Sequence, residues 1–411
     1  MKLIYSFLLA LLAISTFAIG PNGNKLVSYT LWNTVTKEEL REKMKKNHVP
    51  KALLNPKYDV DIYDITYKSF WHDGTSILAS GLVFMPKGVN KPMAEVVYHH
   101  GTRVEKGRKK NINGVDNVCL GLAVDGYLVI QPDYIGLGHG DKFHLYQQYK
   151  SLGQASVDMI YAVREFNDTF NIKLNQQLFL TGYSEGGYAA VATNKLIQES
   201  YPDLKVTATA GNSGAYDMEG VQSQVMFKKY ERPHYLPFLL NGLNEVYHMV
   251  PDIRAIYNPP FDSIIPDMFE KGKSYKEIDA VLPLIPKDML RDTFVQLYLN
   301  DSNFILHKAL ADNSLCHWKP ENPIQLCFCK NDEQVSYKNS IVARNGMKEL
   351  GAKHITLTEG GKKYGHNKCA LFASMYAQLY FDSFRNGSKY GRRGNAGKRM
   401  LLAFARLGIK P

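Results

Sequence analysis

The N-terminal part of the chain contains two stretches, residues 59–70 and 76–86, in which apolar and polar residues alternate. Such alternation is typical of β-strands with one buried face. The tetrapeptide WHDG separates the two stretches, and an Asp-Gly pair is typical of a tight turn between antiparallel strands. We therefore expect a β-hairpin that turns at Asp73-Gly74.

Further along the chain, short apolar stretches alternate with segments that have helical spacing. Continuous apolar runs bounded by turn residues indicate strands that are buried on both faces. The expected strands are 93–101, 127–133, 176–184, 204–211, 323–329 and 354–360, and the expected helices are 117–126, 151–166, 185–200, 337–351 and 367–384. This order predicts an α/β fold whose mostly parallel sheet carries helices on both faces.

The alternation stops between residues 218 and 321, where aromatic residues, prolines and short helical pieces predominate. This segment is too long for a plain connection in a compact domain, and we expect it to be a helical cap. The predicted organisation is a signal peptide (1–18), a core in two parts (19–217 and 322–385), the cap (218–321) and a basic C-terminal tail (386–411).

The signal peptide is predicted from Lys2, the apolar run LIYSFLLALLAISTF and the small residues around it. The run is short for a bilayer span, so we expect cleavage and a secreted or periplasmic mature protein. The net charge of +11 includes eight basic residues, and no acidic ones, between Arg385 and Pro411. The charge is therefore a property of the tail, and we expect no nucleic-acid partner. The tail is expected to be solvated, with weak contact to an anionic membrane surface as the alternative.

The chain has five cysteines, an odd number for an exported protein. Cys327 and Cys329 are two residues apart on an expected strand, so their side chains share one face and do not easily bridge each other. We expect a disulfide between Cys316 and one of these two, with buried free thiols as the alternative. The sequence has no C-x-x-C, H-E-x-x-H or nucleotide-binding loop, so we predict neither a metal site nor a cofactor.

The stretch TGYSEGGY, residues 181–188, contains the pattern G-x-S-x-G around Ser184. An apolar strand precedes it and a helix follows without a loop, which is the context of a nucleophile elbow. Gly182 and Gly186 allow the strand and the helix to approach the turn closely. A helix N-cap is the alternative role for Ser184, but it does not explain the two glycines.

A catalytic serine needs a base and a carboxylate that orients the base. Asp332 and Glu333 follow the strand after the cap, and His366 follows the last strand. Side chains in these loops meet at the carboxyl edge of a parallel sheet, where Ser184 lies. The chain order Ser184, Asp332, His366 matches that of α/β-hydrolases, with Glu333 as the reserve acid.

The oxyanion formed during acyl transfer needs hydrogen-bond donors. We expect one to be the backbone N–H of Glu185, and the other to be the N–H of Thr102, with Arg103 as the alternative. A substrate-binding role is expected for four further residues around the serine, namely His100, Gly101, Tyr183 and Tyr134.

The motifs YHHGT, PDYIGLG, GYSEGG, KNDEQV and YGHNKC together resemble those of the secretory lipases and related bacterial esterases, within the α/β-hydrolases. The resemblance covers roughly residues 60–385. It implies an α/β-hydrolase fold with the cap inserted before the acid-bearing strand. It also implies cleavage of small-molecule or lipid esters through an acyl-enzyme on Ser184, with an acyl pocket in the cap. An aminopeptidase-like serine peptidase and a non-catalytic binding protein on the same scaffold are the alternatives.

Overall fold

A computed structural model describes residues 24–46, 55–107, 116–269, 273–391 and 396–408. The predicted signal peptide, residues 1–18, lies outside the described residues. Within the described part of the chain, none of the helices has the length and apolar character needed to span a bilayer.

The core is one nine-stranded sheet with the strand order β1-β2-β3-β5-β4-β6-β7-β8-β9. Strands β1, β2, β3 and β5 pair antiparallel, and all pairs from β5 to β9 are parallel. The strand bounds are β1 Leu26–Val35, β2 Val60–Phe70, β3 Ser76–Pro86, β4 Met93–His99, β5 Tyr127–Pro132, β6 Leu174–Tyr183, β7 Val206–Asn212, β8 Ile324–Cys329 and β9 Ile355–Gly361. The β2–β3 pairing confirms the hairpin predicted at Asp73-Gly74, and the mostly parallel sheet confirms the predicted fold class.

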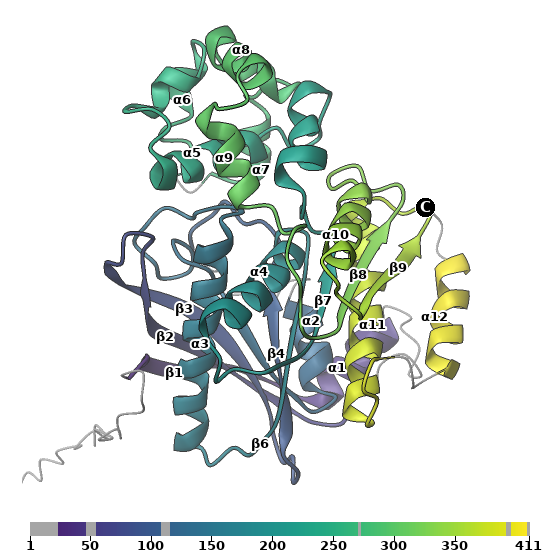
Figure 1. Ribbon diagram of the computed structural model, residues 1–411. Helices are drawn as coiled ribbons and strands as arrows, with labels where there is room; N and C mark the ends of the chain where they lie inside the picture. The colour runs from purple at the N-terminus through teal and green to yellow at the C-terminus, as the bar shows by residue number, and fades with distance from the viewer. Residues whose placement is uncertain (1–23, 47–54, 108–115, 270–272, 392–395, 409–411) are drawn as a thin grey trace, which may run out of the picture.

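Helices cover both faces of the sheet (Figure 1). One face packs against α3 (Tyr149–Thr169) and α4 (Glu185–Ser200). The other packs against α1 (Lys37–Lys46), α2 (Asp116–Ala123) and α11 (His366–Arg385). Helix α10 (Lys338–Glu349) lies on the same side as α4. The strands between these layers are almost entirely buried, as their continuous apolar sequences predict.

Between β7 and β8 the described chain forms helices and one isolated bridge, Tyr257 with Leu290. The α-helices among them are α5 (Tyr235–Tyr247), α6 (Phe261–Ile264), α7 (Tyr275–Asp279), α8 (Asp292–Asn300) and α9 (Ile305–Asp312). They gather at one end of the sheet, at the top of Figure 1. Their buried apolar residues join α4 and α10 in one core cluster, so the cap packs directly onto the α/β layer.

The predicted pairing of Cys316 is wrong. Cys329, at the end of β8, forms a disulfide with Cys369 in the first turns of α11, while Cys119, Cys316 and Cys327 are buried free thiols. Cys316 packs with the cap and α10, whereas Cys329 and Cys369 pack together on the other side of β8. The sheet therefore separates Cys316 from its predicted partners.

Within the basic tail, the described residues after the gap at 392–395 form α12 (Ala396–Gly408). Leu402 is fully buried in a cluster with residues of α11, so this helix is docked on the core. Met400 and Phe404 are exposed. Membrane contact through the tail stays a prediction.

Candidate active site

Ser184 lies at the sharp turn between β6 and α4, with φ 61° and ψ −123°. A non-glycine residue adopts such a conformation at a cost of about 1–3 kcal/mol, which the surrounding structure must offset. The neighbouring strand supplies part of that support, because the Ser184 N–H donates to the Asn212 carbonyl at 2.9 Å. The Asn212 amide in turn donates to the Gly182 carbonyl at 2.8 Å.

The two glycines of the motif are required by close backbone contacts. A Cβ atom at Gly186 would collide with the His99 carbonyl oxygen, and one at Gly182 would collide with the Gly186 carbonyl oxygen. The strained turn, the flanking strand and the flanking helix therefore have the geometry of a nucleophile elbow.

Asp332 and His366 lie in contact, although they are far apart in the sequence. His366 Nδ1 is 2.9 Å from both carboxylate oxygens of Asp332. Asp332 Oδ1 also accepts the backbone N–H groups of Gln334 and Val335, at 3.1 and 2.9 Å. Since an ionised carboxylate only accepts hydrogen bonds, the His366 proton lies on Nδ1 and leaves Nε2 as a free base.

Two further residues hold the backbone of His366. The carboxylate of Glu333 accepts the His366 N–H at 3.0 Å, at the N-terminus of α11. The Tyr183 hydroxyl donates to the His366 carbonyl at 2.6 Å, and the two rings lie 4.9 Å apart. Burial raises the pKa of Tyr183, so this hydroxyl keeps its proton. The reserve acid Glu333 therefore binds the backbone of His366, whereas Asp332 contacts the His366 imidazole.

Ser184 and His366 line the same cleft, together with Gly101, Thr102 and Tyr183. Among the described residues, no hydrogen bond joins the Ser184 hydroxyl to His366. Such bonds are often long in the absence of substrate and shorten in the complex. Gly101 lies against Tyr183 and Ser184, just before the start of α4, and Thr102 lines the same cleft. The first N–H groups of a helix have no partner within the helix, so the Glu185 N–H is suited to bind an oxyanion.

The structure places His100 and Tyr134 behind the site, and neither lines its cavities, so their predicted contact with substrate has no support from their positions. Both His100 ring nitrogens face backbone carbonyls, Gly101 at 2.7 Å and Asp133 at 3.1 Å. Burial lowers the pKa of His100 to about 3. The Tyr134 hydroxyl donates to the His100 carbonyl at 2.8 Å. The two side chains therefore stabilise the loop that carries Gly101.

A buried pair next to Ser184 was not predicted from the sequence. His144 Nε2 lies 2.7 Å from Glu185 Oε1, and both side chains are almost completely buried. His144 Nδ1 faces the Ile135 carbonyl at 3.1 Å. His144 belongs to an irregular loop of the sequence, where no spacing or motif connects it to Ser184.

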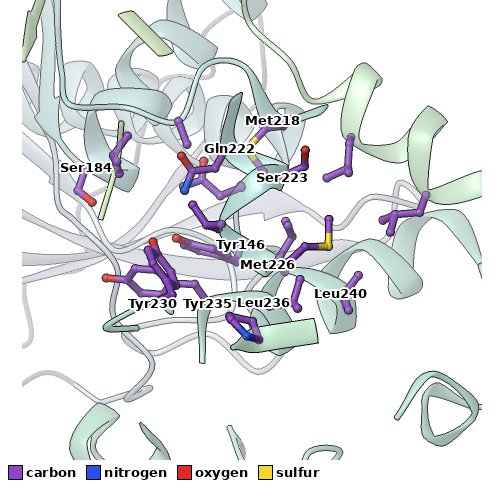
Figure 2. A pocket seen from close by; sticks show the side chains of 18 residues that line it. Tyr146, Ser184, Met218, Gln222, Ser223, Met226, Tyr230, Tyr235, Leu236 and Leu240 are labelled. Atoms are coloured by element: carbon purple, nitrogen blue, oxygen red, sulfur yellow. The ribbon is translucent and has the colours of Figure 1, made fainter. Parts of the chain in front are cut away.

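Two cavities meet at Ser184. The cap cavity is narrow and has about 710 Å³ of empty space, part of it open to solvent. Its walls are mostly apolar side chains of the cap, with Ser184 at one end and Leu240 toward the other (Figure 2). The second, the wide cleft, has about 1920 Å³ of empty space, part of it open to solvent. Ser184 and Tyr235 line both cavities.

In the described ranges of the chain, no group of three or more His, Cys, Asp or Glu side chains has the arrangement of a metal site.

Comparisons with solved structures show the same fold. The chain superposes on a Legionella pneumophila protein classed as a hydrolase with a TM-score of 0.83 and 26% identity, over 89% of this chain and 99% of that one. For the rice cell wall degrading esterase LipA from Xanthomonas oryzae, the TM-score is 0.77 and the identity 20%, over 89% and 99% of the two chains. For Candida antarctica lipase A the values are 0.65 and 15%, over 90% and 84%.

The sheet order, the elbow at Ser184 and the structural neighbours define the chain as an α/β-hydrolase. No curated protein sequence matches it significantly. The model of the secretory lipase family matches residues 114–380, well over half of the chain. The chain therefore belongs to the secretory lipase family, and it is an ester hydrolase.

Proposed function

We propose that this protein is a secreted serine hydrolase that cleaves carboxylic esters through an acyl-enzyme on Ser184. The observation that carries the proposal is the contact of His366 with Asp332, on the wall of the cleft that contains the strained serine. Family membership favours an ester over an amide as the bond that is cleaved.

In the first half of the reaction, Ser184 Oγ attacks the ester carbonyl while His366 Nε2 takes its proton. Asp332 keeps the imidazole in the required tautomer and stabilises the imidazolium that forms. His366 then returns the proton to the leaving alcohol oxygen. In the second half, His366 activates a water molecule that hydrolyses the acyl-enzyme and regenerates the serine.

The negative charge on the carbonyl oxygen requires donors that are fixed before the reaction. The Glu185 N–H at the start of α4 and the Thr102 N–H on the opposite loop are the proposed donors. The α4 dipole adds a favourable partial positive charge at the same point.

The acyl chain is proposed to occupy the cap cavity. Its lining includes Met226, Leu236, Leu239 and Leu240, which offer an apolar surface continuous with Ser184. Burying a methylene group there contributes about 0.8 kcal/mol, enough to favour acyl chains of several carbons over acetyl.

Secretion is proposed from the family and from the signal sequence predicted over residues 1–18. The Cys329–Cys369 disulfide supports it, because disulfides persist in oxidising compartments.

The proposal is tested by comparing Ser184→Ala, Asp332→Asn and Glu333→Gln with the wild type on p-nitrophenyl butanoate. We expect kcat to fall by roughly 10⁴-fold or more for Ser184→Ala and by about 10³–10⁴-fold for Asp332→Asn, since triad members act as a unit. Glu333→Gln is the matched control, and its loss is expected to be about tenfold at most. Normal turnover by Ser184→Ala, or equal losses for Asp332→Asn and Glu333→Gln, would contradict the assignment.

A further inference from the structure

The two cavities at Ser184 are not equivalent, because His366 lines the wide cleft and not the cap cavity. In ester cleavage, the base that takes the serine proton returns it to the leaving oxygen. The leaving oxygen must therefore lie within reach of His366. An ester bound at Ser184 consequently places its alcohol half in the wide cleft and its acyl half in the cap cavity.

We propose that the wide cleft binds a large amphipathic alcohol that carries an anionic group. This inference rests on the proposed function, because it concerns the leaving half of the same ester. The cleft has about 1920 Å³ of empty space, against about 710 Å³ for the cap cavity, and both values include space open to solvent, so the cleft has room for an alcohol much larger than ethanol.

The body of the alcohol is recognised by apolar side chains from three helices that cover one face of the sheet. Their contributions to the lining are Leu40 and Met44 from α1, Val118 and Leu122 from α2, and Ala370, Leu371 and Met375 from α11. Leu371 is half exposed, and in the lining it adjoins apolar side chains that are buried. These walls fit a hydrocarbon portion of the alcohol, such as a second acyl chain.

The positive charge of the cleft lining favours an anionic group on the polar part of the alcohol. Among the described residues, the side chains that line the cleft include two cations, Lys43 and Arg103, and no carboxylate. Lys43 Nζ is held at 2.8 Å from Asn117 Oδ1 on the wall. Arg103 follows Thr102 directly, and its side chain is 27% exposed. The buried Asp133 is an ionic neighbour of Arg103 at 3.9 Å, a distance that leaves the guanidinium with donor capacity for an anion.

The test uses three esters with the same octanoyl group, each below its micellar concentration. They are ethyl octanoate, 1,2-dioctanoylglycerol and 1,2-dioctanoylglycerol 3-phosphate, and released octanoate is measured. We expect kcat/KM to be about tenfold or more higher for dioctanoylglycerol than for ethyl octanoate, from the apolar area that the cleft covers. The phosphate is expected to add about a further fivefold, typical of a partly exposed charge pair.

The cations are tested by the ratio of the two kcat/KM values, phosphorylated over neutral. Lys43→Gln and Arg103→Gln should each lower this ratio toward one. Lys45→Gln is the control, because it removes the same charge from an exposed position of α1 that does not line the cleft. Lys45→Gln should leave the ratio at its wild-type value.

A wild-type ratio of one or less, or a ratio that responds equally to Lys45→Gln and Lys43→Gln, would overturn the anionic specificity. No gain from ethyl octanoate to dioctanoylglycerol would overturn the large-alcohol site. Both results leave the proposed function standing if ethyl octanoate is cleaved and Ser184→Ala abolishes that cleavage. If none of the three esters is cleaved, the proposed function and this inference both fail.

Discussion

At the scale of single residues, the Glu185–His144 pair raises a question of protonation. The Ile135 carbonyl accepts only, so His144 Nδ1 must carry a proton. The 2.7 Å contact between His144 Nε2 and Glu185 Oε1 then also requires a proton, held by one or the other group. Glu185 Oε2 is buried without a hydrogen-bond partner. His144 is therefore the hydrogen-bond partner on which the buried carboxyl group of Glu185 depends.

We therefore expect removal of His144 to lower the free energy of unfolding more than neutralisation of Glu185 does. His144→Phe leaves a buried carboxyl group unpaired, and we expect a loss of about 3–5 kcal/mol in the free energy of unfolding. Glu185→Gln preserves a donor to His144 Nε2, and we expect a loss of about 1.5 kcal/mol or less. Urea denaturation of the two variants measures both losses. Equal losses would show that the pair is not coupled as described.

The sequence supplied the candidate triad, because chain order and strand ends indicate which loops share one edge of the sheet. It could not reveal the hydrogen bonds by which Tyr183, His100 and Tyr134 support the backbone around the site. Whether a side chain at a strand end faces a cavity or the core depends on the local path of the chain, which periodicity does not specify. The contact of Asp332 rather than Glu333 with the His366 imidazole is a detail of the same kind.

At the scale of secondary-structure elements, the disulfide joins the two segments that carry Asp332 and His366. Cys329 lies three residues before Asp332, and Cys369 lies three residues after His366. The disulfide therefore ties together the two chain segments whose side chains make the Asp332–His366 contact. This link was missed because cysteine spacing cannot reveal which face of a strand meets which helix.

We expect the double variant Cys329→Ser/Cys369→Ser to lose both stability and turnover. With a sequence separation of 40, the entropy of the unfolded chain gives a loss of about 4 kcal/mol, within the usual range of about 2–5. Activity should fall by about tenfold because the acid and the base are held less rigidly. Thermal denaturation and kcat measurements check the two effects. An unchanged melting temperature would contradict the stabilising role.

The cap elements set the length of the acyl chain in this account. Leu240 on α5 lies away from Ser184 along the cap cavity (Figure 2). Leu240→Phe should therefore lower the ratio of kcat/KM for decanoate over butanoate esters by about tenfold, from the cost of overpacking. Leu299→Phe, at an exposed position of the cap, is the control. An unchanged ratio for Leu240→Phe would place the acyl chain elsewhere.

At the scale of the whole molecule, the stability against acid should depend on buried histidines. His99 is fully buried, and its ring nitrogens contact Thr181, Ser156 and Thr193. Burial lowers its pKa to about 4. Below about pH 6.5 the unfolded chain binds a proton at this position that the folded chain does not. Lowering the pH from about 6.5 to about 4 therefore favours unfolding.

The variant His99→Gln removes this linkage. The difference in free energy of unfolding between the wild type and His99→Gln should narrow by about 1.6 kcal/mol from pH 6.5 to pH 5, because the slope approaches its full value of about 1.4 kcal/mol per pH unit only below pH 6.5. Chemical denaturation at several pH values measures it. His139→Gln, which changes a half-exposed histidine, is the control. A difference that stays constant with pH for His99→Gln would contradict the linkage.

The overall architecture follows from hydrophobic periodicity, because each strand and helix of the core buries a face that its own sequence encodes. The two cavities at Ser184 cannot be predicted from hydrophobic periodicity. Their walls combine α1, α2, α11 and the cap, and their shapes depend on how these distant segments pack. Substrate class is therefore a property of tertiary structure here, whereas the reaction class is visible in short motifs.

The proposed roles of Ser184 as the nucleophile and of His366 as the base that activates it can be tested chemically. The most direct measurement is the rate and position of covalent modification by diisopropyl fluorophosphate, followed by intact mass and peptide mapping. We predict one adduct per chain, located on Ser184, with the rate reduced at least about 10³-fold in His366→Ala. An adduct at another residue, or undiminished modification of Ser184→Ala, would contradict the account.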